Sequence, residues 1–276
     1  MVALAEAAGH VVIASDVNAA GLRAPARGEI RSGDLSDPAV RARVLRGVDS
    51  VVHTAALLDS GSDVSQLGKV NTELVVRLYE DAAKTGVRRF VHMSTSMLYG
   101  VGQSQPLTED SEVAPRGPHG LSKQGAEAFL TGRAASDGPA WTVLRAAPIY
   151  GRRGRHFAAA LLVVGPMLKL GLPVLPRFVG GPRASLVHAE DVARALLFCL
   201  GEPRTAQRVF NVSDDDPMTL GDRISMTFDA YGLRSVGQVN VPRSVLGGTA
   251  QFFSAPGPYD VADVAALSWW SGVVMR

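Results

Sequence analysis

The chain has 276 residues, of which 46% are hydrophobic, enough for one substantial core, or for a core with a small second lobe. Its 28 Lys and Arg residues nearly balance 26 Asp and Glu residues, so a net charge of +2 gives no electrostatic basis for nucleic acid as the main partner. The single cysteine, Cys199, lies in the apolar run ALLFCL, which excludes a disulfide framework and a cysteine-based metal site and predicts a buried structural thiol.

The first residues, MVALAEAAGH, have no basic region ahead of their apolar residues and lead directly into a strand pattern. A secretory signal peptide would need that basic region. We therefore expect a protein of the cytoplasm. Separately, we expect a small-molecule substrate as the partner and no metal ion.

Short apolar strands alternate with helical segments over the first two thirds of the chain. This rhythm predicts an α/β fold with a doubly wound, Rossmann-like parallel sheet. A first helix is already under way at Met1, and the expected strands cover residues 10–16, 29–37, 48–56, 88–96 and 141–151. Helices are expected over residues 37–47 and 70–86, the second with Val70, Leu74, Leu78 and Ala82 on one face and Gly86 as its C-terminal cap.

After Gly151 the pattern changes to connections rich in Pro and Gly, which predicts a smaller lobe. We expect residues 1–150 to form the Rossmann-like domain and residues 151–276 mainly the substrate lobe, with about 184–212 interleaved with the end of the sheet. This interleaved part includes a helix over 189–201 and a strand over 208–214. The apolar segment 157–176 is interrupted by Gly, Pro and Lys, so it predicts a helix and loop of the lobe rather than a membrane span, with peripheral membrane contact as the lesser alternative.

Asp16 ends an apolar strand that follows a helix, the place where a dinucleotide fold puts the acid that binds the adenosine ribose hydroxyls. Val17 and Asn18 follow it, and no Arg stands immediately after to accept a 2′-phosphate. This favours NAD over NADP. The competing interpretation is an Asp that only caps a turn at the end of a strand.

Eight motifs follow in order and at matching spacing: SGDLSD, VVHTAALLD, VNTELVVRL, GVRRFVHMSTSMLYG, HGLSKQGAEAF, TVLRAAPIYGRRGR, SLVHAEDVARALL and VFNVSDD. Through them the chain resembles the extended short-chain dehydrogenase/reductases, the NAD-dependent epimerase/dehydratase family, and within it the 3β-hydroxysteroid dehydrogenase-like branch. The resemblance covers nearly the whole chain. It implies NAD as the cofactor and a homodimer formed through the helices around residues 70–85 and 120–133.

The resemblance implies cofactor-binding residues at several strand ends: Asp16, Asp34, Leu35, Ala55, Ala56, Asn71, Lys123, Pro148, Ile149 and Tyr150. The pair 34–35 would lie beside the adenine, the pair 55–56 along the phosphates and ribose, and residues 148–150 beside the nicotinamide. Asn71 would start a helix near the active site. Lys123 would hold the nicotinamide ribose.

Catalytic roles are implied for Thr95, His119 and Lys123. Thr95, four residues before Tyr99, matches the Ser or Thr that hydrogen-bonds the reacting oxygen, with Ser94 and Ser96 as neighbouring candidates. As a cation, Lys123 would lower the pKa of the acid/base group beside it.

His119 stands where the family has a tyrosine, one helical turn before the lysine. A tyrosine starts near a pKa of ~10 and is brought towards neutrality by the cation, whereas a histidine starts near ~6.5 and is pushed lower. A neutral imidazole accepts a proton from an alcohol, so oxidation is favoured over carbonyl reduction. The imidazole is also shorter than the phenol, so its nitrogen reaches less far towards the reacting oxygen, and catalysis depends steeply on that placement. Three interpretations follow: an impaired or non-catalytic relative, a histidine-for-tyrosine enzyme with shifted pH dependence, or replacement by another group such as Tyr99.

The glycine-rich dinucleotide loop should begin about 20 residues before the ribose acid, which is ahead of Met1. We therefore expect an N-terminally incomplete Rossmann-like sheet from a truncated or misassigned start, with two buried strand edges unpaired where the central first strand would lie. The C-terminus, which stops before the family's usual last segment, is expected to be cut as well. Trp269 and Trp270 are expected to pack against the substrate lobe.

The function expected from these observations is NAD-linked hydride transfer at a secondary alcohol or ketone. The apolar segment 157–176 favours a lipophilic, sterol-like substrate. One alternative is a nucleotide-sugar epimerase or dehydratase, in which transient oxidation by tightly held NAD starts the reaction. The other is a non-catalytic or truncated relative that acts as a sensor or binding protein.

Overall fold

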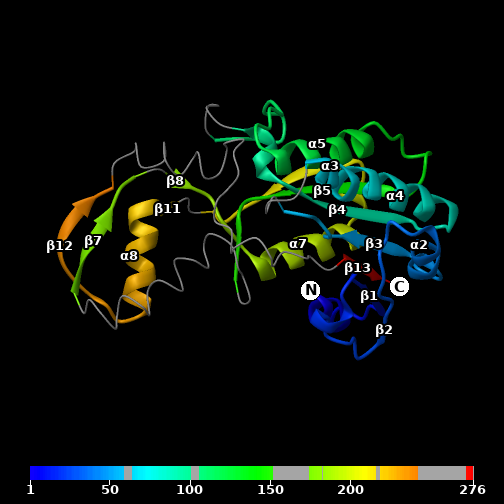
Figure 1. Cartoon of the computed structure of the whole chain (residues 1–276), viewed down its shortest axis with the longest axis horizontal. Helices are drawn as coiled ribbons and strands as arrows, with labels where there is room; N and C mark the ends of the chain where they lie inside the picture. The colour runs from blue at the N-terminus through cyan, green and yellow to red at the C-terminus, as the bar shows by residue number, and fades with distance from the viewer. Residues whose placement is uncertain are drawn as a thin grey trace.

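The computed structural model describes residues 1–58, 64–100, 106–151, 174–181, 183–215, 218–241 and 272–275. A seven-stranded sheet in the order β10-β5-β4-β3-β13-β1-β2 forms the larger part of the molecule, on the right in Figure 1. The strands are β1 Val12–Ser15, β2 Gly28–Ile30, β3 Ser50–His53, β4 Arg89–Thr95, β5 Ala140–Ala146, β10 Arg208–Val212 and β13 Gly272–Met275. The pairs β1/β2, β3/β4, β4/β5 and β5/β10 are parallel, as the sequence predicted, and β13 runs antiparallel to both its neighbours.

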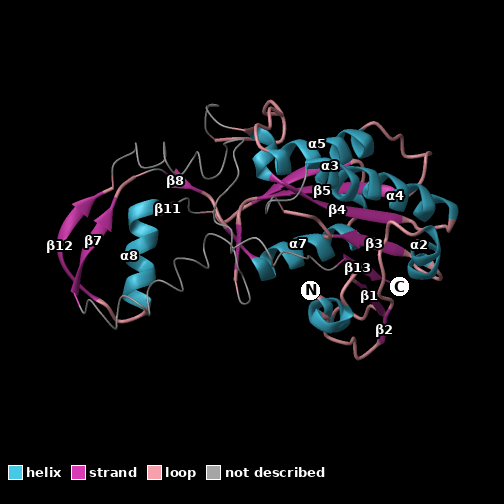
Figure 2. Cartoon of the chain, in the orientation of Figure 1, coloured by secondary structure: helices cyan, strands magenta, loops and turns pink. Residues whose placement is uncertain are grey.

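Helices cover both faces of the sheet (Figure 2). On one face lie α2 Pro38–Leu45, α4 Leu74–Lys84 and α5 Pro118–Thr131, which share a core with β3, β4 and β5. On the other face lie α1 Val2–Ala7 and α7 Ala189–Gly201, whose core includes the buried Cys199. This arrangement confirms the predicted Rossmann-like α/β fold.

The helix predicted over residues 70–86 is longer and less regular than expected. It begins as α3 Val64–Gly68, passes through a π-helical turn, η2 Lys69–Glu73, and continues as α4. Gly86 follows α4 with a φ of +80°, a left-handed conformation that glycine adopts without strain, so the predicted cap is confirmed. Short 3-10 turns complete this domain: η1 Ala19–Gly21, η3 Ser96–Tyr99 and η4 Pro203–Thr205.

The sheet differs from expectation between β1 and β3. The sequence predicted two unpaired strand edges here, and no strand was expected near residue 272. In the structure β13 lies in this position and pairs with β1 from Val12↔Met275 to Ser15↔Gly272, and with β3 from Val52↔Val273 to Ser50↔Met275. Backbone donors and acceptors of buried strands need partners, and the short β-prone run GVVM supplies them from the far end of the chain.

The smaller part of the molecule lies at the opposite end from β1 and β2 (Figure 1). It contains β7 Val174–Val179 paired in parallel with β12 Arg234–Asn240, and α8 Leu220–Ala230. The Ser225 hydroxyl of α8 bonds the backbone N–H and C=O of Phe178 at 2.8 and 2.7 Å, which fixes the helix to β7. Two short pairs join this part to the sheet: β8 Arg183–Ala184 with β11 Met218–Thr219, and β6 Ile149–Tyr150 with β9 Val187–His188.

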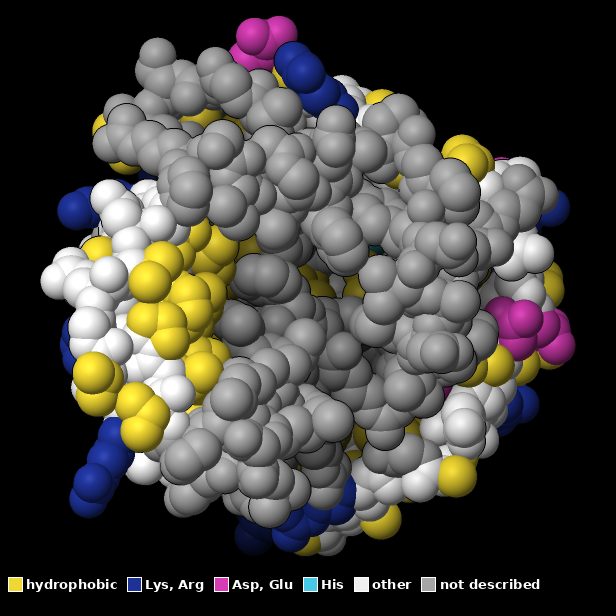
Figure 3. All heavy atoms as spheres, turned by 60° about the vertical axis from the view of Figure 1, so that its left-hand side comes forward, with side chains coloured by type: hydrophobic (Ala, Val, Ile, Leu, Met, Phe, Trp, Pro, Cys, Tyr) yellow, Lys and Arg dark blue, Asp and Glu magenta, His cyan; other side chains and the backbone are white. Residues whose placement is uncertain are grey.

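Residues 157–173 of the predicted lobe helix and loop, and both tryptophans near the C-terminus, lie outside the described residues. Residues 174–176 begin strand β7 rather than a helix or loop. Within the described ranges, no helix is long and apolar enough to cross a membrane. Figure 3 views the molecule with the left-hand side of Figure 1 brought forward, and apolar side chains gather at the left of this view. Val174 of β7 and Val236 and Val239 of β12 are exposed.

Candidate active site

Lys123 carries the buried amino group of the site. It lies on α5, is 2% exposed, and donates a hydrogen bond from Nζ to the carbonyl of Met93 on β4 at 2.9 Å. Burial lowers the pKa of Lys123 to about 7, because an apolar environment disfavours the charged form. The ammonium and the neutral amine are therefore both populated near neutral pH. For Lys123 to be fully protonated, as the sequence predicted, a negatively charged group must lie nearby.

A pair of buried histidines lies on the same face of the sheet. His53 on β3 and His92 on β4 are register partners, their Nδ1 atoms are 3.2 Å apart, and their rings stack with centroids 5.3 Å apart. Burial, with a smaller contribution from the charge of Lys123, lowers the pKa of His53 to about 3. The same causes, joined by His53, lower the pKa of His92 well below its usual value. Two neutral rings in this contact share one hydrogen between their Nδ1 atoms.

His119 is fixed by a backbone group that the sequence analysis did not identify. Its Nδ1 lies 3.3 Å from the carbonyl oxygen of Leu57, and a carbonyl can only accept a hydrogen bond. A neutral imidazole in this contact must therefore carry its hydrogen on Nδ1, which leaves the lone pair at Nε2. In this tautomer Nε2 is the nitrogen that can accept a proton.

Asn71 holds Leu57 in place. Its Oδ1 accepts from the Leu57 N–H at 2.7 Å, and its Nδ2 donates to the Leu57 carbonyl at 2.8 Å and to the Ser122 hydroxyl at 2.9 Å. The Ser122 hydroxyl in turn donates to the carbonyl of His119 at 2.8 Å. The fully buried Asn71 thus joins the loop after β3 to α5 and positions the imidazole. The π-helical turn η2 places Asn71 in this position, a role that suits such turns.

The hydroxyl candidates lie at the end of β4. The Thr95 hydroxyl oxygen accepts the N–H of Met97 at 3.2 Å, so its hydrogen remains available for a donor bond. Ser94, on the same face of β4 as His92, is 4% exposed, and its hydroxyl has no partner among the described residues. Ser96 begins the turn η3.

Tyr99, the possible replacement for the missing tyrosine, is held elsewhere. Its hydroxyl donates to Asn211 Oδ1 at 2.6 Å and accepts from Arg145 at 2.8 Å. Arg145 forms a buried ion pair with Glu127. The Tyr99 hydrogen is therefore directed to β10, and this geometry favours His119 over Tyr99 as the proton acceptor.

The loops after β1 and β2 meet at the other side of the sheet, because the Gly33 N–H donates to the carbonyl of Asp16 at 3.0 Å. Asp16 is half-buried, and its Oδ1 accepts the Asn18 N–H at 2.9 Å, so it does close a turn at the strand end. Asp34 is exposed and accepts the Ser36 N–H at 2.8 Å, and Leu35 packs against the core.

The remaining predicted cofactor residues lie in two loops. Ala55, half-buried, and Ala56, buried, follow β3 immediately before Leu57. Pro148 is exposed, Ile149 packs on the core formed by α1 and α7, and Tyr150 contacts His188 edge-to-face at 5.2 Å. Burial, followed by the Asp214 carboxylate, raises the pKa of Tyr150. His188 itself accepts the Glu190 N–H at 3.4 Å and caps α7.

These residues fit a dinucleotide. Asp16 and Asp34 lie at the carboxyl ends of neighbouring strands, the region where doubly wound sheets hold ligands. Farther across the sheet, the buried Lys123 and the Ser94 hydroxyl, which bonds to none of the described residues, supply polar groups at the carboxyl end of β4. Asp16 would hold the adenosine ribose and Lys123 the nicotinamide ribose.

Comparison with known proteins identifies the family. The NAD dependent epimerase/dehydratase family matches residues 1–213 of the chain. The chain belongs to this family. The family resemblance inferred from the motifs, and NAD as the family's cofactor, are thereby confirmed.

Two of the proteins to which the chain is similar act on nucleotide sugars by their names. UDP-glucose 4-epimerase of Streptomyces lividans is 34% identical over 143 residues, which is 49% of this chain and 43% of that protein. The dTDP-glucose 4,6-dehydratase of Streptomyces griseus is 27% identical over 219 residues, covering 78% and 66% of the two chains. The chain spans about half the length of the first curated relatives it matches.

Among solved structures, MoeE5 in complex with UDP-glucose and NAD superposes with a TM-score of 0.69 at 26% identity, covering 87% of this chain and 80% of MoeE5. Its fold agrees with the Rossmann-like assignment. These relatives favour the nucleotide-sugar alternative over the sterol-like substrate, and none of the three supports the 3β-hydroxysteroid dehydrogenase-like branch.

Proposed function

We propose that the protein binds NAD and a nucleotide-linked sugar and oxidises a sugar hydroxyl as the first step of an epimerase or dehydratase reaction. The observation that carries the proposal is the contact between His119 Nδ1 and the Leu57 carbonyl, which directs the imidazole lone pair to Nε2 on the helix that carries Lys123. The nucleotide-sugar enzymes among the relatives support this substrate class.

The residues would divide the reaction as follows. NAD, when bound, supplies the acceptor for the hydride that leaves the sugar carbon. Thr95 donates its hydroxyl hydrogen to the reacting oxygen and orients it. His119 Nε2 takes the proton of that hydroxyl as the carbon–hydrogen bond breaks, so the alcohol becomes a ketone and the imidazole becomes cationic. Lys123 holds the nicotinamide ribose, and the negative charge of the cofactor favours its ammonium form.

Conversion of UDP-glucose or dTDP-glucose to an epimer or a keto sugar tests the proposal, with the NADH that forms transiently in the first turnover followed by stopped-flow absorbance and NAD binding by calorimetry. We expect the wild-type protein to bind NAD and to reduce it with one of these sugars. His119→Ala should keep the NAD affinity and lower kcat/KM at least about 100-fold, the usual loss for a general base.

The second candidate is a binding protein that has kept the fold without catalysis, and the specific observation behind it is His119 at the position of the family's tyrosine. His119→Tyr separates the two. If the wild-type protein binds NAD but never reduces it, while His119→Tyr gains turnover, the protein is a non-catalytic relative. If neither protein binds NAD, the proposed function is wrong.

A further inference from the structure

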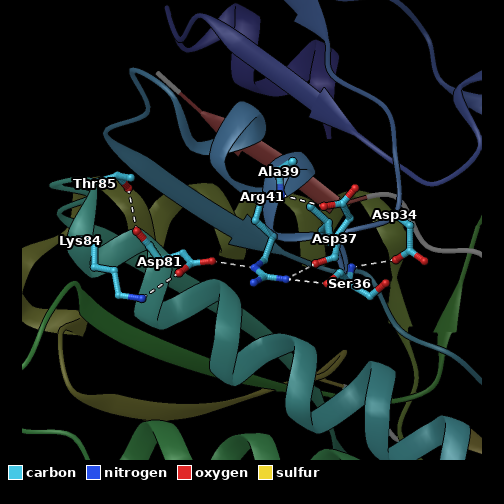
Figure 4. Close-up of polar contacts among 9 residues, drawn as sticks. Asp34, Ser36, Asp37, Ala39, Arg41, Asp81, Lys84 and Thr85 are labelled. Carbon is cyan, nitrogen blue, oxygen red and sulfur yellow. Dashed lines mark hydrogen bonds and ion pairs between the residues drawn. The ribbon is translucent and has the colours of Figure 1, made fainter.

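Arg41 makes an unusual set of contacts between α2 and α4. Its side chain is 7% exposed, its Nε donates to Asp81 Oδ2 at 2.7 Å, and its Nη1 donates to the carbonyls of Leu35 and Ser36 at 2.8 and 2.9 Å (Figure 4). A single buried guanidinium thus joins a carboxylate on α4 to two consecutive peptides of the loop after β2. An unpaired buried charge is costly, so these three acceptors fix its position.

Asp81 is itself held in place, which makes the arrangement rigid. Its Oδ1 accepts from Lys84 at 3.1 Å, and its carbonyl accepts the Thr85 hydroxyl at 3.0 Å (Figure 4). Partial burial alone would raise the pKa of Asp81, but the hydrogen bonds from Arg41 and Lys84 outweigh this and lower it. The carboxylate is therefore ionised at neutral pH and remains a partner for Arg41.

The loop that Arg41 holds turns its other side outward. Asp34 Oδ1 accepts the Ser36 N–H, the Asp34 carbonyl accepts the Asp37 N–H at 3.1 Å, and Asp37 Oδ1 caps α2 through the Ala39 N–H at 2.8 Å. The carbonyls of residues 35 and 36 point inward to Arg41, whereas the Asp34 side chain is exposed beside the Asp16 loop. Arg41 would therefore fix the backbone conformation of the loop that a ligand bound between these two loops contacts, although Arg41 itself lies on the inner side of that loop.

We propose that Arg41, oriented by Asp81, is a positioning residue for the adenosine half of the dinucleotide, which it shapes through the 34–36 backbone without touching the ligand. This inference rests on the proposed function, since it places the adenosine between the loops after β1 and β2. Lysine cannot replace arginine here, because one ammonium on a flexible stem cannot bond the carboxylate and both carbonyls in a fixed fork.

The test compares Arg41→Lys with the wild-type protein in binding of NAD, AMP and nicotinamide mononucleotide. We expect Arg41→Lys to weaken NAD and AMP by about tenfold each, the equivalent of about 1.4 kcal/mol, and to leave nicotinamide mononucleotide within about twofold. In turnover the KM for NAD should rise while kcat stays within about twofold. Hydrogen exchange of the Ser36 and Asp37 amides should become faster, a readout that needs no ligand.

Arg77→Lys is the matched control, because Arg77 forms an exposed i,i+4 ion pair with Glu73 on the same helix as Asp81 and should change none of these quantities. Asp81→Asn is the second variant: it keeps an acceptor but removes the charge, so it should weaken AMP in the same direction and less. Equal AMP affinity in wild type and Arg41→Lys would overturn the inference while leaving the proposed function intact. Equal losses for AMP and nicotinamide mononucleotide would also overturn it, since they indicate general loosening. A wild-type protein that binds neither NAD nor AMP would overturn both this inference and the proposed function.

Discussion

The neutral state of the His53–His92 pair makes the stability of the protein depend on pH. An unfolded imidazole takes up a proton near pH ~6.5, whereas the folded protein resists protonation of His53 until a pH of about 3. Between these values the unfolded state holds more protons, so stability falls as the pH falls. This is the pattern expected of histidines that are buried in the uncharged form.

We predict that the double variant His53→Leu/His92→Leu unfolds with a flatter dependence on pH between about 6.5 and 4, by up to about 1.4 kcal/mol per pH unit for each proton no longer taken up. Removing both partners leaves no orphaned nitrogen, so stability at pH 7 should change little, whereas His92→Leu alone strands the Nδ1 atom of His53 and should be more destabilising than the double variant. Urea unfolding at a series of pH values measures this. His10→Gln, at a partly exposed position, is the control, and an unchanged slope in the double variant would contradict the prediction.

At the residue scale, the family resemblance picks out residues whose own side chains would carry the chemistry. His119 and Lys123, one helical turn apart, are such residues, and their catalytic roles stay predictions. Leu57 could not be found, because it acts through its peptide group, whose partners Asn71 and His119 depend on how two helices approach the loop. The histidine pair was equally hidden, since residues 39 apart in sequence meet only through the register of β3 and β4.

At the element scale, α5 and the π-helical turn η2 approach each other unusually closely. A Cβ atom at Gly125 would lie 2.7 Å from the Cγ2 and 2.8 Å from the Oγ1 of Thr72, and the Thr72 hydroxyl donates to the carbonyl of Ser122 at 2.5 Å. The helical periodicity around residues 70–86 predicted an amphipathic helix, and the structure agrees for α4. The π-helical turn was not predicted, because it is set by what packs against it rather than by its own sequence.

We predict that Gly125→Ala destabilises the protein by about 1–3 kcal/mol, the usual cost of overpacking, although Ala is otherwise the better helix former by about 1 kcal/mol. The β-branched Thr72 side chain cannot move away without losing its bond to Ser122. Gly68→Ala, at a helical position with open space around it, is the control and should be neutral or stabilising. Thermal unfolding of both variants tests this, and Thr72→Ala should rescue Gly125→Ala. A stabilised Gly125→Ala protein would be the opposite result.

At the scale of the whole molecule, the sequence predicted the layers of the fold and most strands, since apolar runs and caps are local signals. It did not predict the partner for the inner edges of β1 and β3. Residues 272–275 are about 220 residues from β3 in sequence, and pairing over such a distance leaves no periodic trace in the chain. The strand bounds also came out shorter than predicted, because the carboxyl ends of β1, β2 and β3 turn into the loops that form the site.

The pairing of β13 can be tested one amide at a time. The Val12 N–H donates to the carbonyl of Arg27 on the β2 side, so the alternation of a strand directs the amides of Ile13 and Ser15 to β13. In a chain ending at residue 271 these two amides should exchange markedly faster, while those of Val12 and Ala14 change less because β2 still pairs with them. Thermal stability should fall as two buried strand edges lose their partner. Hydrogen exchange followed by NMR resolves the four positions, and equal exchange at all four in both chains would show that β13 does not pair with β1 in solution.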